Sequence, residues 1–229
     1  MRRSELLPAF LLVLFAASTA SAQDDSSGMA LEGGSRISIQ GGWRYALNDT
    51  FYNNYYTQPG NLGLERAATA RGGLLGVATF AYSIKDSLEM GIDLFATTQK
   101  MSLTQQPPLK TASYGALLGM RTQTWLDLGP YGTVPFIGLM TGPFVAAAQF
   151  EGQKARETLM QAWALTAGGT LRLTPQWGVC LEYRFVLARG GVGTPEQRLG
   201  SFNAGGSWLT LGVTYTFARE PDSPLSSPF

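Results

Sequence analysis

The feature that most constrains this chain is an alternation of apolar and polar residues that returns in segment after segment. Between Arg36 and Leu47, the residues at odd positions are apolar, aromatic or glycine, and those between them are mostly polar or small. A period of two puts successive side chains on opposite faces of a β-strand, whereas an amphipathic helix would need a period of 3.6. The same alternation recurs at 88–97, 112–121, 163–173, 177–185 and 209–217. The pattern therefore predicts an all-β protein.

Two further segments, 73–83 and 133–148, look like strands but are apolar on both faces, so the sequence leaves their orientation open. The second could also be a membrane helix. However, Pro135, Gly138, Gly142 and Pro143 disfavour a helix interior, and the segment is shorter than the roughly 20 residues that a helical span needs. We therefore predict a strand here, which brings the total to eight.

The connections between these segments alternate in length. Long or intermediate ones at 48–70, 98–110, 123–132, 149–159 and 188–206 are interleaved with short ones at 84–87 and 174–176. Outer-membrane barrels have long loops outside and short periplasmic turns. Only 14% of the residues are charged, which is low for a soluble domain and suits an exterior that faces lipid. Residues 35–217 are thus predicted to form a closed antiparallel up-and-down transmembrane β-barrel of about eight strands.

The N-terminus has the features of a cleaved signal peptide. Arg2 and Arg3 precede an apolar stretch at 6–17, and Ala20-Ser21-Ala22 fits the small-residue cleavage rule, which predicts cleavage after Ala22. The apolar stretch is too short for a membrane anchor. Residues 23–34 are interpreted as a flexible polar leader, and residues 218–229 as a Pro/Ser-rich tail.

Aromatic residues gather near the predicted strand ends, as expected at the two bilayer interfaces. The girdle at the short-turn, periplasmic end consists of Tyr82, Trp125, Tyr131, Trp177, Tyr215 and Phe217. The outer girdle consists of Trp43, Tyr45, Tyr114, Trp163 and Phe185. Trp208 breaks the rule, because its parity groups it with the polar face.

The last third of the chain carries a family resemblance. The segments Trp177–Phe185 and Leu209–Phe217 resemble the closing hairpin of small outer-membrane β-barrel proteins of the OmpA-, OmpX- and OmpW-like kind. The resemblance implies a place in the bacterial outer membrane, with outer-membrane lipid, the assembly machinery and periplasmic chaperones as partners. It also implies that an aromatic residue at the end of the last strand is the assembly signal, and either Phe217 or Phe229 could serve.

Charged residues collect on the faces predicted to point into the barrel: Arg36, Arg44, Glu89, Asp93, Arg121, Arg172, Glu182 and Arg184. An eight-stranded barrel is only wide enough for side chains to fill it, and buried charges there must pair. We expect a salt-bridged core with Glu182 as its hub; a narrow polar conduit is the alternative.

Several classes of function are disfavoured. The chain has no histidine, which removes mechanisms that need an imidazole base or ligand. Glu89 and Asp93 would lie roughly 13 Å apart along one strand, too far for a glycosidase pair. With a net charge of +1 and a single cysteine, Cys180, the sequence offers no sign of nucleic-acid binding and no internal disulfide. We expect no enzyme activity, no cofactor and no metal.

The first long loop contains the aromatic cluster Phe51, Tyr52, Tyr55 and Tyr56. Exposed tyrosines of this kind suit contact with a surface ligand, and the alternative is a loop that packs its own aromatics onto the barrel rim. Three functions stay open: a structural or surface-interaction barrel, a narrow channel for small or apolar solutes, and a soluble periplasmic carrier of the lipocalin kind.

Overall fold

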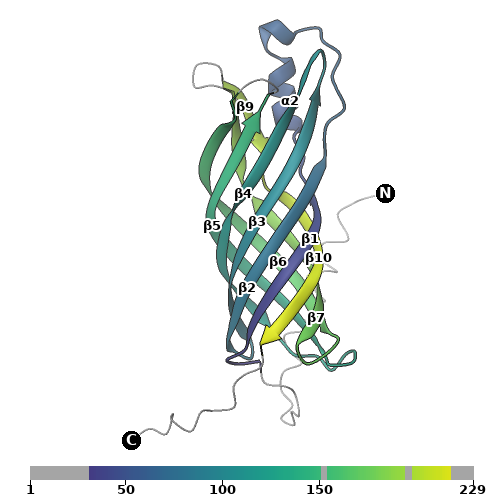
Figure 1. Ribbon diagram of the computed structural model, residues 1–229. Coiled ribbons are helices and arrows are strands. Elements are labelled where there is room, and N and C mark those ends of the chain that lie inside the picture. Colours follow the sequence, from purple (N-terminus) through teal and green to yellow (C-terminus); the bar gives the residue numbers. More distant parts are fainter. Residues whose placement is uncertain (1–30, 151–153, 194–197, 218–229) are drawn as a thin grey trace, which may run out of the picture. The chain divides into compact units, whose positions relative to one another are not determined.

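The chain forms a barrel that closes on itself, as the computed structural model shows for residues 31–150, 154–193 and 198–217 (Figure 1). The strands follow the ring order β1-β10-β7-β6-β5-β4-β3-β2, and every neighbouring pair is antiparallel. Their bounds are β1 Ser35–Tyr45, β2 Gly72–Lys85, β3 Leu88–Leu103, β4 Gln106–Gln123, β5 Thr133–Gln149, β6 Arg156–Arg172, β7 Trp177–Leu187 and β10 Gly206–Phe217. The predicted fold class is confirmed, and closure pairs the backbone groups of each strand with those of its neighbours.

Side-chain direction follows the predicted parity in the strands that alternate clearly. The structure also settles the two segments that were left open. In β2, Leu75 and Val77 point inward while Leu74 and Phe80 are exposed. In β5, the even-numbered residues such as Phe144 are buried, and Pro143 lies on the outer face. The exterior of the barrel is thus a broad apolar surface, which suits lipid.

One predicted loop is wrong. Residues 98–110 are paired strand: Lys100 lies opposite Lys110, Met101 opposite Leu109, and the turn is reduced to Thr104 and Gln105. Gln105 closes this turn at a φ of 60°. The hairpin of β3 and β4 therefore extends beyond the shorter strands β1, β7 and β10 (Figure 1).

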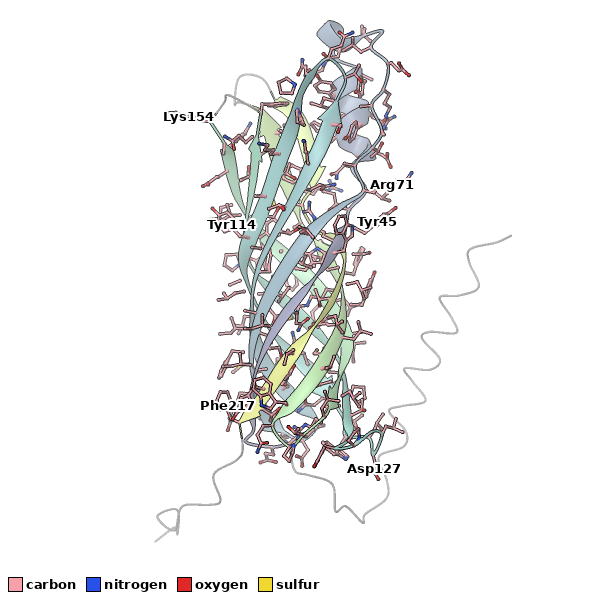
Figure 2. All side chains as sticks on the ribbon, turned by 45° about the vertical axis from the view of Figure 1, so that its right-hand side comes forward. Tyr45, Arg71, Tyr114, Asp127, Lys154 and Phe217 are labelled. Atoms are coloured by element: carbon pink, nitrogen blue, oxygen red, sulfur yellow. The ribbon has the colours of Figure 1, made fainter. Side chains whose placement is uncertain are left out.

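Two other long connections contain regular structure. Residues 48–70 hold the helix α2, Asp49–Tyr56, and the short helix η1, Pro59–Asn61. Residues 188–206 hold a second hairpin made of β8, Arg189–Gly193, and β9, Arg198–Asn203. We call the end with α2 and this hairpin the long-loop end, and the opposite end, with the turns at 86–87 and 173–176, the short-turn end (Figures 1 and 2). Ser35 and Phe217 pair at the short-turn end.

The predicted flexible leader is partly wrong, because residues 31–34 are hydrogen-bonded to the barrel. The backbone N–H groups of Leu31 and Glu32 donate to Asp86 Oδ1 at 2.6 and 2.8 Å. The predicted signal peptide, residues 23–30 and the tail 218–229 lie outside the described residues. Within the described part of the chain, no helix is long and apolar enough to cross a membrane.

Candidate functional site

The half of the lumen nearest the short turns is filled by a charge network. Arg36 forms a bidentate pair with Glu89, with its Nε 2.6 Å from Oε2 and its Nη2 2.7 Å from Oε1. Arg121 Nη2 lies 2.8 Å from Asp93 Oδ2 and 3.4 Å from Glu182 Oε1. Arg184 joins the same two carboxylates, at 3.1 Å from Asp93 and 2.8 Å from Glu182. Three guanidinium groups and three carboxylates thus form one cluster without net charge.

Neutral side chains on β1, β2 and β6 donate further hydrogen bonds to the network. Thr79 donates to Asp93 at 2.6 Å, and Gln40 donates to Glu182 at 3.1 Å. Thr166 also donates to Glu182, whose carboxylate therefore lies at the centre of the cluster. From β5, the ring of Phe136 lies 5.1 Å from the guanidinium of Arg121. Arg121, Asp93, Glu182 and Arg184 have no exposed surface, so their mutual contacts must compensate for the loss of water.

Two of the predicted interior charges lie outside this cluster. Arg44 is buried nearer the long-loop end, where it donates to Gln99 Oε1 at 2.6 Å and to the carbonyl of Ala204 at 2.7 Å. Arg172 lies at the short-turn mouth, with its guanidinium 5.2 Å from the ring of Trp125. The sequence pattern identified these residues as inward-facing but could not tell which arginines share carboxylates.

The half of the lumen nearest the long loops contains an apolar core beside the buried polar residues Arg44 and Gln99. Trp208 is fully buried, with its ring centroid 5.0 Å from that of Phe95, and Phe95 lies 5.4 Å from Phe144. Met101, Leu109 and Leu117, also fully buried, belong to the same core. The prediction from parity that Trp208 faces inward is therefore correct, but the rings around it are apolar.

The helix α2 adds its aromatic residues to this apolar core. Three of them, Phe51, Tyr52 and Tyr55, are at most 2% exposed and therefore offer no surface to a ligand. They match the alternative prediction, in which the loop packs its aromatic residues onto the barrel. Tyr52 donates to the carbonyl of Ser102 at 3.2 Å. Burial raises the pKa of the Tyr52 hydroxyl.

Tyr56 is half-buried and fixes the chain after α2. Its hydroxyl lies 3.1 Å from Thr104 Oγ1 and accepts from the backbone N–H groups of Ala67 and Thr104. Burial alone would raise the pKa of Tyr56, but these hydrogen bonds hold it below the ordinary value. The segment 48–70 is thus tied to the tip of the β3–β4 hairpin.

The predicted girdle residues lie at the two ends of the apolar wall. In Figure 2, Tyr45 and Tyr114 lie toward the long-loop end and Phe217 at the short-turn end. The five outer-girdle residues are all exposed on the outer face: Trp43, Tyr45, Tyr114, Trp163 and Phe185. At the short-turn end Tyr82, Tyr131, Trp177 and Phe217 are exposed, and Tyr215 packs between Trp177 and Phe217. Trp125 is the exception, because its ring covers Arg172 at the mouth of the lumen.

In the described part of the chain, no group of three carboxylate or thiol side chains is placed to hold a metal ion. Cys180 is a buried free thiol inside the charged half of the lumen, 3.9 Å from Gln40 Nε2.

Solved structures of small outer-membrane barrels resemble this fold. The outer membrane protein OprG from Pseudomonas aeruginosa aligns over 84% of this chain and 99% of its own, with a TM-score of 0.52 and 12% identity. Neisserial surface protein A covers 81% of this chain and 98% of its own, with a TM-score of 0.48 and 16% identity. The attachment invasion locus protein of Yersinia pestis covers 81% and 99%, with a TM-score of 0.46 and 15% identity.

No known family model matches the chain, and no curated protein matches it. At these sequence identities the similarity shows the fold alone, and the alignment with OprG supports that fold.

Proposed function

Because the chain has the fold of the small outer-membrane β-barrel proteins, we propose that it is a bacterial outer-membrane protein that conducts no solute and acts through its outer rim and outer wall. Its role on this proposal is structural or concerns surface interaction. The observation that carries the proposal is that side chains seal the lumen at two levels.

The first seal is the charge network and the second is the apolar core. Arg121 and Arg184 span the lumen near the short turns, and Trp208 with Phe144 does so near the long loops, all without exposed surface. A narrow channel needs a continuous polar path, and the packed rings of Trp208, Phe95 and Phe144 interrupt such a path. The channel alternative is therefore disfavoured.

The soluble-carrier alternative is disfavoured by the outer wall. A carrier of that kind would be polar outside and hollow inside. Here Ile39 is 71% exposed, Leu74 68% and Leu94 58%, and they belong to a continuous series of outward-facing apolar residues. Lipid is the environment in which such a wall is stable, so outer-membrane lipid, with the assembly machinery and chaperones that deliver barrels to it, are the partners we propose.

Catalysis does not enter the proposal. The full sequence has no histidine, and the buried carboxylates Glu89, Asp93 and Glu182 are occupied by arginines. A carboxylate held in this way is not available as a general base.

Conductance measurements test this proposal. The protein, refolded into lipid and shown to be folded by its altered mobility on unboiled gels, is added to planar bilayers beside a general porin as positive control. We expect no discrete conductance steps from this protein under conditions in which the porin gives them. Reproducible single-channel steps that disappear when the protein is omitted would overturn the sealed-lumen proposal and favour the channel.

A further inference from the structure

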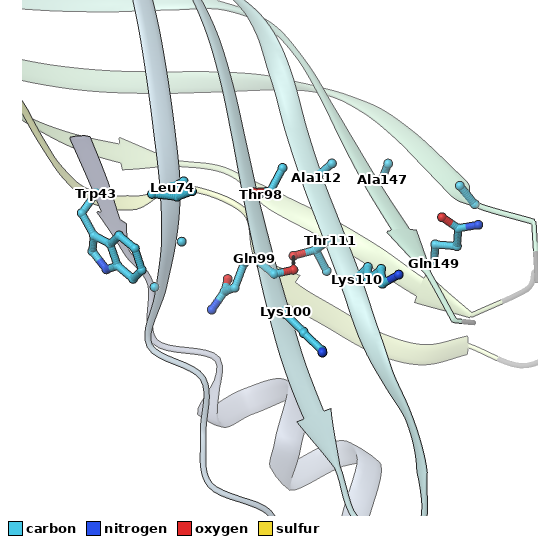
Figure 3. A pocket seen from close by; sticks show the side chains of 13 residues that line it. Trp43, Leu74, Thr98, Gln99, Lys100, Lys110, Thr111, Ala112, Ala147 and Gln149 are labelled. Atoms are coloured by element: carbon cyan, nitrogen blue, oxygen red, sulfur yellow. Dashed lines mark hydrogen bonds between the residues drawn. The ribbon is translucent and has the colours of Figure 1, made fainter. Parts of the chain in front are cut away.

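A trough of about 540 Å³ crosses the outside of the barrel near the long-loop end (Figure 3). Its floor is made of small side chains, Thr98, Ala112 and Ala147, which lie side by side on β3, β4 and β5. Trp43 and Leu74 form one flank. The trough is therefore an apolar depression in the wall that the proposed function assigns to lipid.

Two lysines border this apolar floor on the long-loop side. Lys100 and Lys110 are both exposed and lie directly opposite each other on β3 and β4 (Figure 3). Like charges directly opposite on one face of an antiparallel pair repel each other. Among the described residues neither lysine has a carboxylate within 4.0 Å. Within the described part of the chain, the pair is thus a concentrated positive site without a counter-charge.

Among the described carboxylates, Glu157 borders the trough, because it lies opposite Ala147 on β6. It accepts a hydrogen bond from the hydroxyl of Tyr114 at 3.4 Å. Glu157 therefore interacts with the girdle below the trough rather than with the lysines.

The height of the two lysines above the aromatic girdle determines which part of a lipid they contact. Lys110 lies four residues beyond Tyr114 on β4, which is about 13 Å along the strand and about 10 Å along the membrane normal for a strand tilted by about 40°. The headgroup layer begins just outside the aromatic girdle and is several ångströms deep. Ala112 of the floor lies two residues beyond Tyr114, about 5 Å outside the girdle by the same measure, so the floor lies in the headgroup layer. The long lysine stems can bend back toward the membrane, which places their ammonium groups at the level of lipid phosphates.

The charge of the two ends supports this placement. At the long-loop end the exposed cations among the described residues outnumber the exposed carboxylates: Arg66, Arg71, Lys100, Lys110, Lys154 and Arg189 against Asp49, Glu65 and Glu157. At the short-turn end the balance is reversed, with Lys85 against Glu32, Asp86 and Asp127. The positive end is the one that the fold directs to the outer leaflet.

We propose that this trough binds a phosphorylated lipid of the outer leaflet, with its headgroup over the small-residue floor, its acyl chains against Trp43 and Leu74, and a phosphate bridging Lys100 and Lys110. Phosphate neutralises both charges at once and forms charge-assisted hydrogen bonds with them. The inference rests on the proposed outer-membrane location and adds to it the class of molecule that the outer wall recognises.

The test compares two double variants of equal charge. The trough variant is Lys100→Gln with Lys110→Gln, and the control is Lys85→Gln with Arg66→Gln, which removes two exposed cations that do not line the trough. Each protein is folded in zwitterionic detergent and titrated with lipid A carrying two phosphates, and bound lipid is counted by native mass spectrometry. A basic residue near an anionic surface contributes about a factor of five to binding, so the trough variant should bind roughly 30-fold more weakly than wild type while the control binds as wild type does.

Four outcomes would overturn the inference: equal binding by all three proteins, equal loss in the control, equal binding of dephosphorylated lipid A, or full competition by inorganic phosphate alone. The single variant Lys110→Gln gives a second check, because relief of the repulsion should leave the lipid-free protein unfolding at an equal or higher temperature. A lower unfolding temperature of Lys110→Gln without lipid would contradict the repulsion between Lys100 and Lys110. Folding into a membrane barrel is scored separately by mobility on unboiled gels, so failure of the proposed location is distinguishable from failure of lipid binding.

Discussion

In the half of the lumen nearest the short turns, β3, β4 and β7 place charged residues inward, whereas nearer the long loops the inward residues of the same strands are uncharged apart from Arg184. Large apolar side chains such as Phe95 and Met101 alternate there with neutral polar ones such as Thr97 and Gln99. Strand β3 passes from Glu89 and Asp93 to Phe95 and Met101. The parity of the strand is unchanged across this boundary, but the chemistry that fills the barrel is not. The parity of a strand therefore predicts which side chains face inward, but not whether they are charged or apolar.

The two halves should also fail differently. A buried ion cluster depends on each charge having its partners, so the loss of one member leaves the others uncompensated. An apolar core depends on volume, so the loss of atoms leaves a cavity that partial repacking can reduce. Variants in the two halves can therefore distinguish partner loss from volume loss.

The largest effect is expected from Arg121→Ala, because Arg121 contacts Glu89, Asp93 and Glu182. Leaving those buried carboxylates short of a partner should lower the free energy of unfolding by about 4 kcal/mol. Urea titration of the protein in liposomes, followed by mobility on unboiled gels, measures this. Arg66→Ala is the control, since the Arg66–Asp49 pair is exposed at 3.7 Å and should contribute less than about 1 kcal/mol. Equal losses in the two variants would contradict a tightly coupled cluster.

The next effect is expected from Phe144→Ala in the apolar core. Phe144 has no exposed surface, and its truncation should cost about 3 kcal/mol in the same titration. Leu139→Ala on the lipid-facing side of β5 is the control and should cost less than about 1 kcal/mol. Phe144→Leu should recover most of the loss, whereas Arg121→Met should recover little, because volume does not replace a charge partner. If Arg121→Met were as stable as wild type, the contrast between the halves would fail.

The smallest effect concerns the segment that closes the half nearest the long loops. Tyr56→Phe removes a hydroxyl with three partners and should lower the local stability of α2 by about 1 kcal/mol. Tyr55→Phe removes a buried hydroxyl that has no hydrogen-bond partner and should cost nothing. Hydrogen exchange at the amide of Tyr52, which donates to the carbonyl of Asn48, reports this opening. Faster exchange in Tyr55→Phe than in Tyr56→Phe would contradict the assigned contacts.

The sequence predicted the eight strands and the direction of most side chains, because lipid outside and a narrow lumen inside impose a period of two. It could not orient 73–83 or 133–148, since β2 and β5 carry apolar residues on both faces. This holds even beside the charge network, where the inward Phe136 of β5 packs against Arg121. The signal that was missed in 98–110 is a reversal of polarity. Met101, Leu103 and Leu109 point inward while Lys100 and Lys110 point outward, as in a hairpin that leaves the membrane for water.

The candidate site was predictable as a set of inward charges but not as a network. Parity places Arg36 and Arg44 on the same face of β1, yet Arg36 reaches Glu89 and Arg44 reaches Gln99. Which partner each arginine meets depends on strand order and stagger around the ring, and these are not properties of a single segment. The aromatic residues of α2 were ambiguous for the same reason, because burial of a loop depends on the cavity it covers.

The reactivity of the native thiol shows whether the lumen is sealed and dry. Cys180 is the only cysteine in the chain and is fully buried among the inward residues of β7. With the folded protein in liposomes, a small water-soluble maleimide should leave Cys180 unmodified on both sides of the membrane and modify it after unfolding. The variant Asp127→Cys, with a thiol at an exposed turn, should be labelled once per chain and shows that the reagent is active. Rapid labelling of Cys180 in the folded barrel would contradict the account, because it would show water reaching the middle of the lumen.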